Sequence, residues 1–290
     1  MNTPTRAPRT ALRTAASVIL GIGLLAAAQT AFAAGPTTVG LGTAAPFAVL
    51  AGTPAITNTG PSTITGNVGI APALAVTGFP PGTVSGATHK GDAIAIQAQS
   101  DLTAAYMDAA GRSVTATHGT LGGLTLVGGV YTAGGTTLDL TGTLTLDGQN
   151  DPNAVWIFQA TSDLVTASSS TVNLVNGASA CNVFWQVTSS ATLGSGSTFV
   201  GTIMALTSIT MASGVSLDGR ALARNGEVTL IDDTIDSRAC SGATPQTDSV
   251  ATTTTERTGS IPVVLFAGIF GLALIGFLIV GRPTRRIRDR

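Results

Sequence analysis

The polar and apolar positions between residues 181 and 230 repeat at a nearly constant interval. Three triplets in this stretch contain a small or apolar residue, then a threonine, then an apolar residue, and their threonines are Thr192, Thr210 and Thr229. Glycines recur at the same interval, as Gly196 and Gly214 do. Repeats of roughly 20 residues, with β-forming residues between fixed glycines, indicate the stacked coils of a β-solenoid.

Alternation within the triplets predicts which side chains face the core. Successive side chains of a strand point to opposite faces, so the apolar residues point inward. The inward set is Ala191, Leu193, Ile209, Met211, Val228 and Leu230. The outward set is Ser190, Thr192, Ser208, Thr210, Glu227 and Thr229, with Ser189 and Thr207 beside it. Because coils stack about 4.8 Å apart, the outward set predicts ranks of serine and threonine on a flat wall.

The spacing of apolar residues becomes helical between Asp92 and Gly111. The recurring positions are Ile94, Ala98, Leu102, Ala105, Tyr106 and Ala109. This spacing predicts one long helix that ends at a glycine. Short β segments at 47–51, 55–59 and 62–65 precede the helix, and further strands follow it. The expected fold class is therefore mainly β, an irregular β-helix (β-solenoid) with one long α-helix packed alongside.

The N-terminal segment carries a targeting pattern. Residues 1–33 contain three arginines, an alanine-rich apolar run at 15–28 and an Ala-Phe-Ala motif at 31–33. This order is typical of a secretory signal peptide that is cleaved before Ala34. The alternative is an uncleaved N-terminal membrane anchor, which the short apolar run disfavours.

The C-terminal part of the chain carries a second targeting pattern. Residues 261–281 form an uncharged apolar stretch that is long enough to cross a bilayer once. Five arginines follow in the tail at 282–290, and positive residues favour the cytoplasmic side. The alternative, a buried core helix, does not explain these arginines. We expect a single-pass protein of the cell membrane with a domain at 34–240 outside, a polar linker at 241–260 and a cytoplasmic C-terminus.

Composition narrows the range of partners. Only 10% of the 290 residues are charged and 36 are glycine, which fits tightly coiled β structure. Between residues 34 and 260, six basic residues stand against fourteen acidic ones, a net charge of −8. An acidic domain without a basic patch is a poor nucleic-acid binder. We expect no nucleic-acid partner and a monomeric domain.

Cys181 and Cys240 are the only cysteines of the chain. An even number of cysteines in a protein directed to an oxidising compartment favours a disulfide. This bond would tie the end of the domain to an inner coil and close a loop of about 60 residues, which the chain-entropy model makes worth about 4 kcal/mol.

No set of residues predicts catalysis or metal binding. His89 and His118 are the only histidines, and they lack the spacing of a zinc site. Two acidic clusters, at 232–236 and 147–151, match no EF-hand or calcium repeat and are interpreted as solvated turns. Trp156 and Trp185 are assigned to the core rather than to a sugar-binding platform. We expect no cofactor, no metal and no enzyme activity.

Many separate segments, in order, carry a family resemblance. They include LGTAAPFAVLAG, ITNTGPSTITGNVGI, GFPPGTV, QAQSDLTAAYMDAAGR, LGGLTLVGGVY, LTGTLTLDGQNDPNAVWIFQ, ACNVFWQV, SSATLGSGSTFVGTIMALTSIT and GRALARNGEVTL. Over about residues 39–237, the chain resembles the microbial ice-binding-protein-like family. The resemblance implies an irregular right-handed β-helix of triangular section with a long helix alongside, and a flat face that adsorbs to ice.

On this resemblance, the wall of serine and threonine is the candidate ice-binding face, and ice or ordered water is the partner. Its residues are Ser189, Ser190, Thr192, Thr207, Ser208, Thr210 and Thr229. Hydroxyl and methyl groups on a rigid lattice would order water, and β-branched threonine is stiff at χ1. Glu227 departs from the pattern because a charged group keeps its own hydration shell. Asp163 and Val165 interrupt the matching ranks one coil earlier.

Two other classes of function remain open. One is a surface-adhesion or envelope structural module without ice activity, which a membrane anchor would also suit. The other is a polysaccharide-active enzyme with paired carboxylates, although the sequence places no two carboxylates opposite each other.

The mature protein is expected to begin near Ala34 and to fractionate with the membrane. Protease added to intact cells should remove the domain and leave a C-terminal epitope tag protected, because the arginines hold the tail in the cytoplasm. Immunoblots against the domain and the tag measure this. Quantitative release of the full-length protein in soluble form would refute the anchor.

Overall fold

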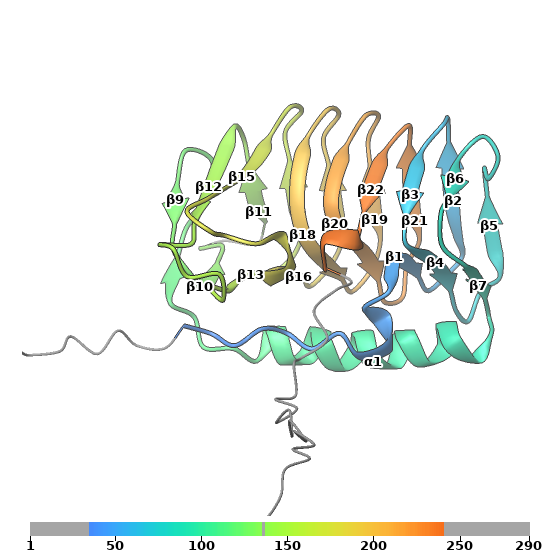
Figure 1. Ribbon diagram of the computed structural model, residues 1–290, viewed down its shortest axis with the longest axis horizontal. Helices are drawn as coiled ribbons and strands as arrows, with labels where there is room; N and C mark the ends of the chain where they lie inside the picture. The colour runs from blue at the N-terminus through green and yellow to red at the C-terminus, as the bar shows by residue number, and fades with distance from the viewer. Residues whose placement is uncertain (1–34, 135–136, 241–290) are drawn as a thin grey trace, which may run out of the picture. The chain divides into compact units, whose positions relative to one another are not determined.

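The computed structural model describes residues 35–134 and 137–240. Figure 1 shows a stack of β-strand coils with one long helix along its lower side. The described residues form twenty-two strands in two parallel sheets, of fifteen and seven strands. Parallel sheets with one long helix confirm the predicted fold class. Three short 3-10 helices are η1 (Gly42–Ala44), η2 (Ala180–Asn182) and η3 (Arg238–Cys240).

The seven-stranded sheet forms one side of the stack, here called the seven-stranded wall. Its strands, in spatial order, are β11 (Leu138–Leu140), β14 (Leu164–Thr166), β17 (Ala191–Leu193), β19 (Ile209–Met211), β21 (Val228–Ile231), β2 (Ala55–Thr59) and β5 (Ala75–Thr77). The six side chains that were predicted to point inward from β17, β19 and β21 are all buried. Strand alternation is therefore confirmed in these coils.

The fifteen-stranded sheet divides into two further walls. The first, here called the open branch, contains β9 (Thr125–Leu126), β12 (Thr143–Asp147), β15 (Thr171–Val175), the first halves of β18 (Thr198–Ala205) and β20 (Ser216–Ala223), β22 (Thr234–Asp236), β3 (Thr63–Thr65) and β6 (Thr83–Val84). The second, the helix-covered branch, contains β8 (Ala116–Thr117), β10 (Gly129–Thr132), β13 (Trp156–Ala160), β16 (Val183–Val187), the second halves of β18 and β20, β1 (Phe47–Ala51), β4 (Asn67–Ile70) and β7 (Thr88–Lys90).

Two glycines allow a strand to belong to both branches. The start of β18 pairs with β15, whereas its end pairs with β16. Between these halves lies Gly201, and the equivalent position of β20 is Gly219. Their φ angles of 103° and 150° lie in a region that residues with a side chain rarely adopt. These two glycines, which are as far apart in the sequence as Gly196 and Gly214 are, thus mark the bend between the two branches.

The order of the coils in space differs from their order in the chain. The N-terminal strands β1, β2 and β3 pair with β20, β21 and β22, the last strands of the domain. After β4 to β7, the chain runs along the stack as α1 and starts a new series of coils at β8 (Figure 1). The first coils therefore extend the walls that the last coils build.

The long helix α1 (Ala93–Ala110) covers one branch and confirms the helix prediction. Its N-cap, Asp92, accepts a hydrogen bond from the backbone N–H of Ala95 at 2.9 Å, which satisfies one of the N–H groups that the start of a helix leaves without a partner. At the other end the buried Gln159 side chain donates to carbonyls of the last turn, which a helix end leaves without partners. One predicted contact is wrong, because Ile94 is 52% exposed and Ala95 takes the buried position.

Stacked aromatic rings fill the interior of the coils. The ring of Phe158 lies 4.1 Å from that of Trp185, and Tyr131 and Phe199 extend the row at 5.6 and 4.6 Å. Trp156 and Trp185 are fully buried, and each indole N–H donates to a backbone carbonyl. Their assignment to the core is confirmed.

The end of the domain is tied to an inner coil, as predicted. Cys181 and Cys240 form a disulfide that joins η2 to η3. Arg220, which is 2% exposed, donates to the carbonyls of Ala45 and Cys240. Burial lowers the pKa of Arg220 to about 10, so the side chain stays charged at neutral pH. It holds the N-terminal and C-terminal segments of the domain together.

One acidic turn is not solvated as expected. Asp233 is 1% exposed, and its carboxylate accepts the backbone N–H groups of Val215 at 2.8 Å and Ile231 at 2.7 Å. Its own N–H donates to the Ser62 hydroxyl. Burial raises the pKa of Asp233 to about 6, against the opposing effect of the two hydrogen bonds. The side chain fixes the corner between the seven-stranded wall and the open branch.

The predicted targeting segments lie outside the described residues. These are the signal peptide at 1–33, the linker at 241–260, the apolar stretch at 261–281 and the tail at 282–290. Within the two described ranges, 35–134 and 137–240, no helix is long and apolar enough to cross a membrane.

The buried carboxyl of Asp233 predicts a loss of stability between pH 4 and 6. Its folded-state pKa of about 6 lies above the ordinary value of 3.8, so the folded state binds the proton more tightly than the unfolded state. The stability from this group is present below pH 4 and is lost as the pH rises through 6, with a slope of at most about 1.4 kcal/mol per pH unit. Denaturant melts across this range measure the effect.

Asp233→Asn is the control, because it removes the titrating group. The variant should lose the decline between pH 4 and 6. It should keep the destabilisation below pH 4, where aspartates with a lowered pKa, such as Asp163 and Asp236, become protonated. The same decline in both proteins would contradict the role of Asp233.

Candidate functional site

Threonines line up along the middle of the seven-stranded wall. The strand register pairs Thr192 with Thr210 and Thr210 with Thr229, as the sequence spacing predicts. It then continues to Thr57 and Thr77 on the N-terminal coils. These five consecutive threonines are called the central rank below. Thr57 and Thr77 were missed from the sequence because nothing in it shows that β2 stacks on β21.

The central rank presents most of its hydroxyls to solvent. Thr192 and Thr77 are exposed, and the other three threonines are half-buried. Thr77 donates to the carbonyl of Ile56 at 3.4 Å, whereas the other four hydroxyls have no protein partner among the described residues. The rank therefore offers methyl and hydroxyl groups that repeat at the strand spacing of about 4.8 Å.

The serines beside the central rank also hold the coils together. Ser190 and Ser208 are half-buried, and each hydroxyl accepts a backbone N–H from the next coil, at 3.4 Å from Ser208 and 3.3 Å from Glu227. Asp163 begins the series by accepting the N–H of Ser190 at 3.1 Å, which lowers the pKa of its carboxyl. Threonines rather than serines thus provide the free hydroxyls of the wall.

Ser189 and Thr207 lie at the corner that leads into the wall. Thr207 is exposed and Ser189 is half-buried, and the N–H of Thr207 donates to the carbonyl of Ser189 at 2.9 Å. The same position in the next coil is Gly226, whose N–H donates to Thr207. This edge of the wall therefore consists of small, uncharged residues in three successive coils.

Charged and bulky groups limit the central rank. Beyond Thr192 the register continues to Val165, which is 38% exposed, and then to Asp139. Glu227 lies beside the rank, where its carbonyl accepts the N–H of Ile209. The interruptions expected at Val165 and Glu227 are therefore present in the structure.

A second line of hydroxyl residues crosses the open branch. The strand register aligns one residue of each strand from β12 to β6. These residues, here called the open-branch rank, are Thr143, Thr171, Thr198, Ser216, Thr234, Thr63 and Thr83. All are exposed except Thr171, which is half-buried. The sequence analysis missed this rank, although a Thr or Ser two residues after each of the repeating Gly196 and Gly214 signals it.

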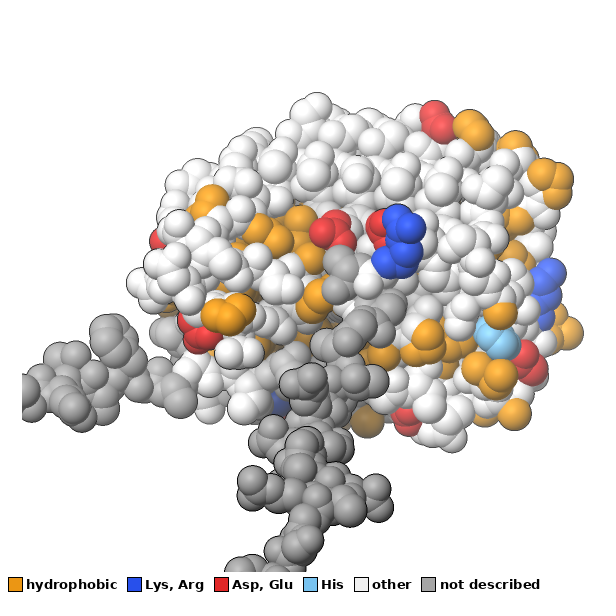
Figure 2. All heavy atoms as spheres, in the orientation of Figure 1, with side chains coloured by type: hydrophobic (Ala, Val, Ile, Leu, Met, Phe, Trp, Pro, Cys, Tyr) orange, Lys and Arg blue, Asp and Glu red, His pale blue; other side chains and the backbone are white. Residues whose placement is uncertain are grey.

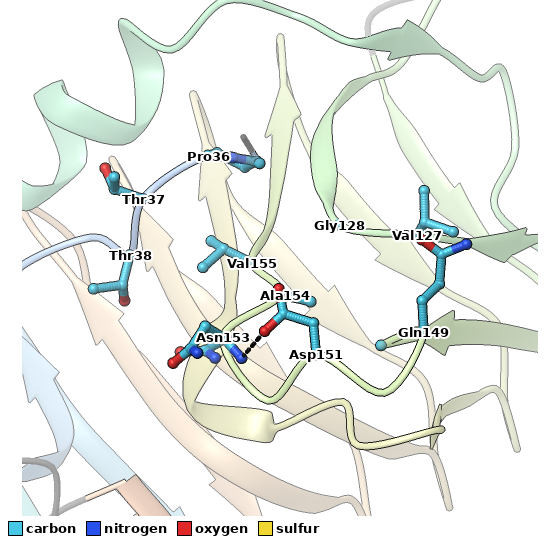
Figure 3. A pocket seen from close by; sticks show the side chains of 13 residues that line it. Pro36, Thr37, Thr38, Val127, Gly128, Gln149, Asp151, Asn153, Ala154 and Val155 are labelled. Atoms are coloured by element: carbon cyan, nitrogen blue, oxygen red, sulfur yellow. Dashed lines mark hydrogen bonds between the residues drawn. The ribbon is translucent and has the colours of Figure 1, made fainter. Parts of the chain in front are cut away.

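A cavity of about 870 Å³ lies away from both ranks, beside residues 35–38 and the loop at 148–154 (Figure 3). Among the described residues that line it, Asp151 is the one acidic residue, and its carboxylate accepts the backbone N–H of Asn153 at 2.9 Å. Glycoside hydrolysis generally uses a pair of carboxylates. The cavity therefore lacks the groups that the enzyme alternative requires.

The acidic clusters form hydrogen bonds within the protein. In the cluster at 147–151, the Asn176 side chain and the Gln149 N–H donate to Asp147, and these bonds lower its pKa. Among the described residues, no three His, Cys, Asp or Glu side chains gather in a way that could hold a metal ion.

Known proteins resemble this chain over most of the solenoid. Residues 49–236 match the family described as Ice-binding-like. An ice-binding protein of Nostoc sp. (strain HG1) is 46% identical over 229 residues, which cover 77% of this chain and 82% of that protein. The crystal structure of an ice-binding protein from an Antarctic biological consortium has a TM-score of 0.69 and 44% identity, and the match covers 71% of this chain and 93% of that one.

A second solved structure agrees. An ice-binding protein of the Antarctic ascomycete Antarctomyces psychrotrophicus has a TM-score of 0.67 at 38% identity, with 70% of this chain and 99% of that chain covered. Ice-binding proteins are a non-enzymatic family, which removes the polysaccharide-active alternative. The parallel coils, the long helix and these relatives agree, and the chain belongs to the Ice-binding-like family.

Proposed function

We propose that this protein binds ice through the central rank of the seven-stranded wall. The observation that carries the proposal is the row of five threonines, from Thr192 to Thr77, in continuous strand register. Membership of the Ice-binding-like family and relatives named as ice-binding proteins support it.

The seven-stranded wall also meets the requirement of a flat surface. The helix α1 packs on β4, β7, β13 and β16, while η2 and η3 pack on β18 and β20. These contacts place the covering elements on the other two walls. Small residues flank the central rank, as Ser208 and Ala212 flank Thr210. A crystal plane can therefore approach Thr210 without meeting a large side chain beside it, whereas at Thr229 the flanking positions hold Glu227 and Ile231.

Threonine suits ice contact for two physical reasons. Its hydroxyl can donate and accept hydrogen bonds with water, and its β-branch restricts χ1, so that each hydroxyl keeps its position. Water molecules held along the row would join a growing ice layer, and adsorbed proteins would then pin the ice front. The backbone ladders, together with the bonds of Asp163, Ser190 and Ser208 to the next coil, keep the row rigid.

We further propose that the domain is attached to the cell surface. The apolar stretch at 261–281 and the arginines after it support a single membrane crossing, with the polar linker at 241–260 as a tether. Cys240, which precedes the linker, is held near β20 by the disulfide and by Arg220. An attached ice-binding domain would hold a cell to ice or inhibit recrystallisation beside it.

Thr210→Tyr is expected to abolish most ice activity without unfolding the domain. The tyrosine ring would rise above the plane between Thr192 and Thr229 and hold these neighbours off the crystal. Recrystallisation inhibition by the purified domain (residues 34–240) should fall at least about tenfold, while stability changes by about 0.5 kcal/mol, as for ordinary surface substitutions. An ice-recrystallisation assay and a thermal melt measure the two effects.

Ala104→Tyr is the matched control, because it adds the same ring at an exposed position of α1. It should retain full activity, and Glu227→Thr should increase activity by removing a charge beside the central rank. Full activity of Thr210→Tyr would exclude this wall as the ice face. If the wild-type domain is inactive, the surface-adhesion or structural interpretation replaces ice binding.

A further inference from the structure

We propose that Asp163, Ser190 and Ser208 are positioning residues of the central rank, which act on ice through the neighbouring threonines and are not themselves in contact with it. The inference rests on the proposed ice-binding function and deepens it, because it separates the groups that touch ice from the groups that hold them in place. Ser190 and Ser208 belong to the face that the sequence predicts to contact ice, so their role changes.

The backbone ladder between coils is interrupted at one position beside the central rank. The N–H of Thr207 donates to the preceding coil, whereas the N–H of Ile209 donates to the following coil. Between them, the N–H of Ser208 has no backbone acceptor among the described residues. The same holds for the equivalent N–H groups of Ser190 and Glu227. Each of these three coils therefore has one N–H group that only a side chain can satisfy.

Side chains of the preceding coil accept these three N–H groups. The Asp163 carboxylate accepts the N–H of Ser190 at 3.1 Å. The Ser190 hydroxyl then accepts the N–H of Ser208 at 3.4 Å, and the Ser208 hydroxyl accepts the N–H of Glu227 at 3.3 Å. A backbone N–H that is removed from water without an acceptor costs free energy. Each contact therefore favours one placement of the next coil.

The Ser208 hydroxyl is directed at the next coil. A Cβ at Gly226, the residue before Glu227, would overlap the Ser208 Oγ as well as the backbone of Thr207. Glycine at position 226 leaves the space through which the hydroxyl reaches the Glu227 N–H. The packing around Gly226 thus gives a second, independent indication that this hydroxyl serves the contact between coils.

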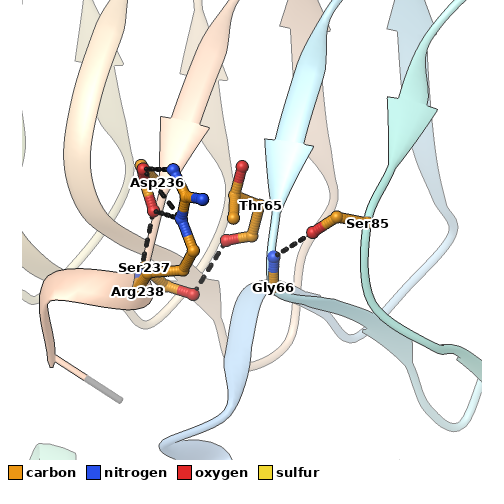
Figure 4. A network of polar contacts seen from close by, with 6 residues as sticks. All are labelled: Thr65, Gly66, Ser85, Asp236, Ser237 and Arg238. Carbon is orange, nitrogen blue, oxygen red and sulfur yellow. Dashed lines mark hydrogen bonds and ion pairs between the residues drawn. The ribbon is translucent and has the colours of Figure 1, made fainter. Parts of the chain in front are cut away.

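The same kind of contact occurs at a corner away from the central rank. Figure 4 shows the Ser85 hydroxyl accepting the N–H of Gly66 in the neighbouring coil at 3.2 Å. The ion pair of Asp236 and Arg238, at 2.7 Å, lies in the same group of residues, and Figure 2 shows charged side chains near the centre of this face. A serine that accepts an N–H across coils is therefore a means of stacking coils, on charged and uncharged surfaces alike.

The position of these contacts links them to the threonines. Each of the N–H groups of Ser208 and Glu227 lies two residues before a threonine of the central rank, Thr210 and Thr229 respectively. The contact fixes the start of the strand, and the β-branch of threonine fixes χ1. Loss of the acceptor leaves the N–H unpaired in a half-buried corner and loosens the start of the strand. The threonine hydroxyl then no longer keeps its place in the row.

Substitutions at Ser208 distinguish positioning from contact. Ser208→Ala removes the acceptor, whereas Ser208→Asn supplies an uncharged one, since an amide oxygen accepts an N–H. Asp163 shows that a side chain of this length reaches the next coil. In the domain (residues 34–240), which contains both core clusters, Ser208→Ala should speed hydrogen exchange at the Glu227 amide about tenfold or more, because the amide opens more readily. Recrystallisation inhibition should fall with it.

Ser208→Asn should restore both the slow exchange and the ice activity. Ser100→Ala is the matched control, because Ser100 is an exposed serine of α1, and it should change neither property. Amide exchange measured by NMR and an ice-recrystallisation assay give the two readouts. If Ser208→Ala does not fold, Ser190→Ala and Ser190→Asn repeat the comparison at the Ser208 amide.

The outcomes separate this inference from the proposed function. An active wild type together with a Ser208→Ala variant that keeps full activity, or keeps slow exchange at the Glu227 amide, would overturn the positioning role and leave ice binding intact. A Ser208→Asn variant that protects the amide but stays inactive would also overturn it, because the serine hydroxyl itself would then contact ice. A wild-type domain without ice activity would refute the proposed function, and the positioning role would fall with it.

Discussion

Parallel, in-register pairing of each coil with the next is the constraint on which the rest of this structure depends. A threonine in one coil becomes part of a row only when the neighbouring coil places a threonine at the paired position. A slip of one residue would turn every outward side chain inward. Side chains at the corners oppose such a slip. The Asp163 carboxylate accepts the N–H of Ser190 in the next coil, and this hydrogen bond would be lost if the register changed. The Asp233 carboxylate likewise accepts the N–H groups of Val215 and Ile231.

The same pairing lets the two ends of the domain build one surface. The N-terminal coils stack on the last coils of the domain, so Thr57 and Thr77 complete a row that begins at Thr192. This arrangement requires a return path along the whole stack, which α1 provides (Figure 1). It also requires a firm junction where the ends meet, and Arg220 bonds the N-terminal segment at Ala45 and the C-terminal segment at Cys240 at once.

The sequence predicts the register between coils that follow one another in the chain, but it does not predict which distant coils stack together. The regular interval between the triplets correctly paired Thr192, Thr210 and Thr229, because consecutive coils of nearly equal length stay in register without further information. The stacking of β2 on β21 was missed, since it joins the first and last parts of the domain through contacts that leave no periodic trace. Ile94 was predicted to be buried and Asp233 to be solvated, and both predictions were wrong. Periodicity does not show which residues pack on the end of a helix, nor which carboxylate in a turn accepts backbone hydrogen bonds.

Most acidic residues in the described part of this net negative domain accept hydrogen bonds from the domain's own backbone. Among the described residues, seven aspartates accept backbone N–H groups: Asp92, Asp101, Asp147, Asp151, Asp163, Asp233 and Asp236. A charged acceptor strengthens such hydrogen bonds, so these charges serve caps and corners and do not require a charged ligand. Of the remaining acidic groups, Asp139 ends the central rank, Glu227 borders it and Asp218 borders the open-branch rank. Carboxylates that the backbone does not use therefore contribute to the limits of both ranks, together with Val165 at the end of the central rank and Asp236 beside the open-branch rank.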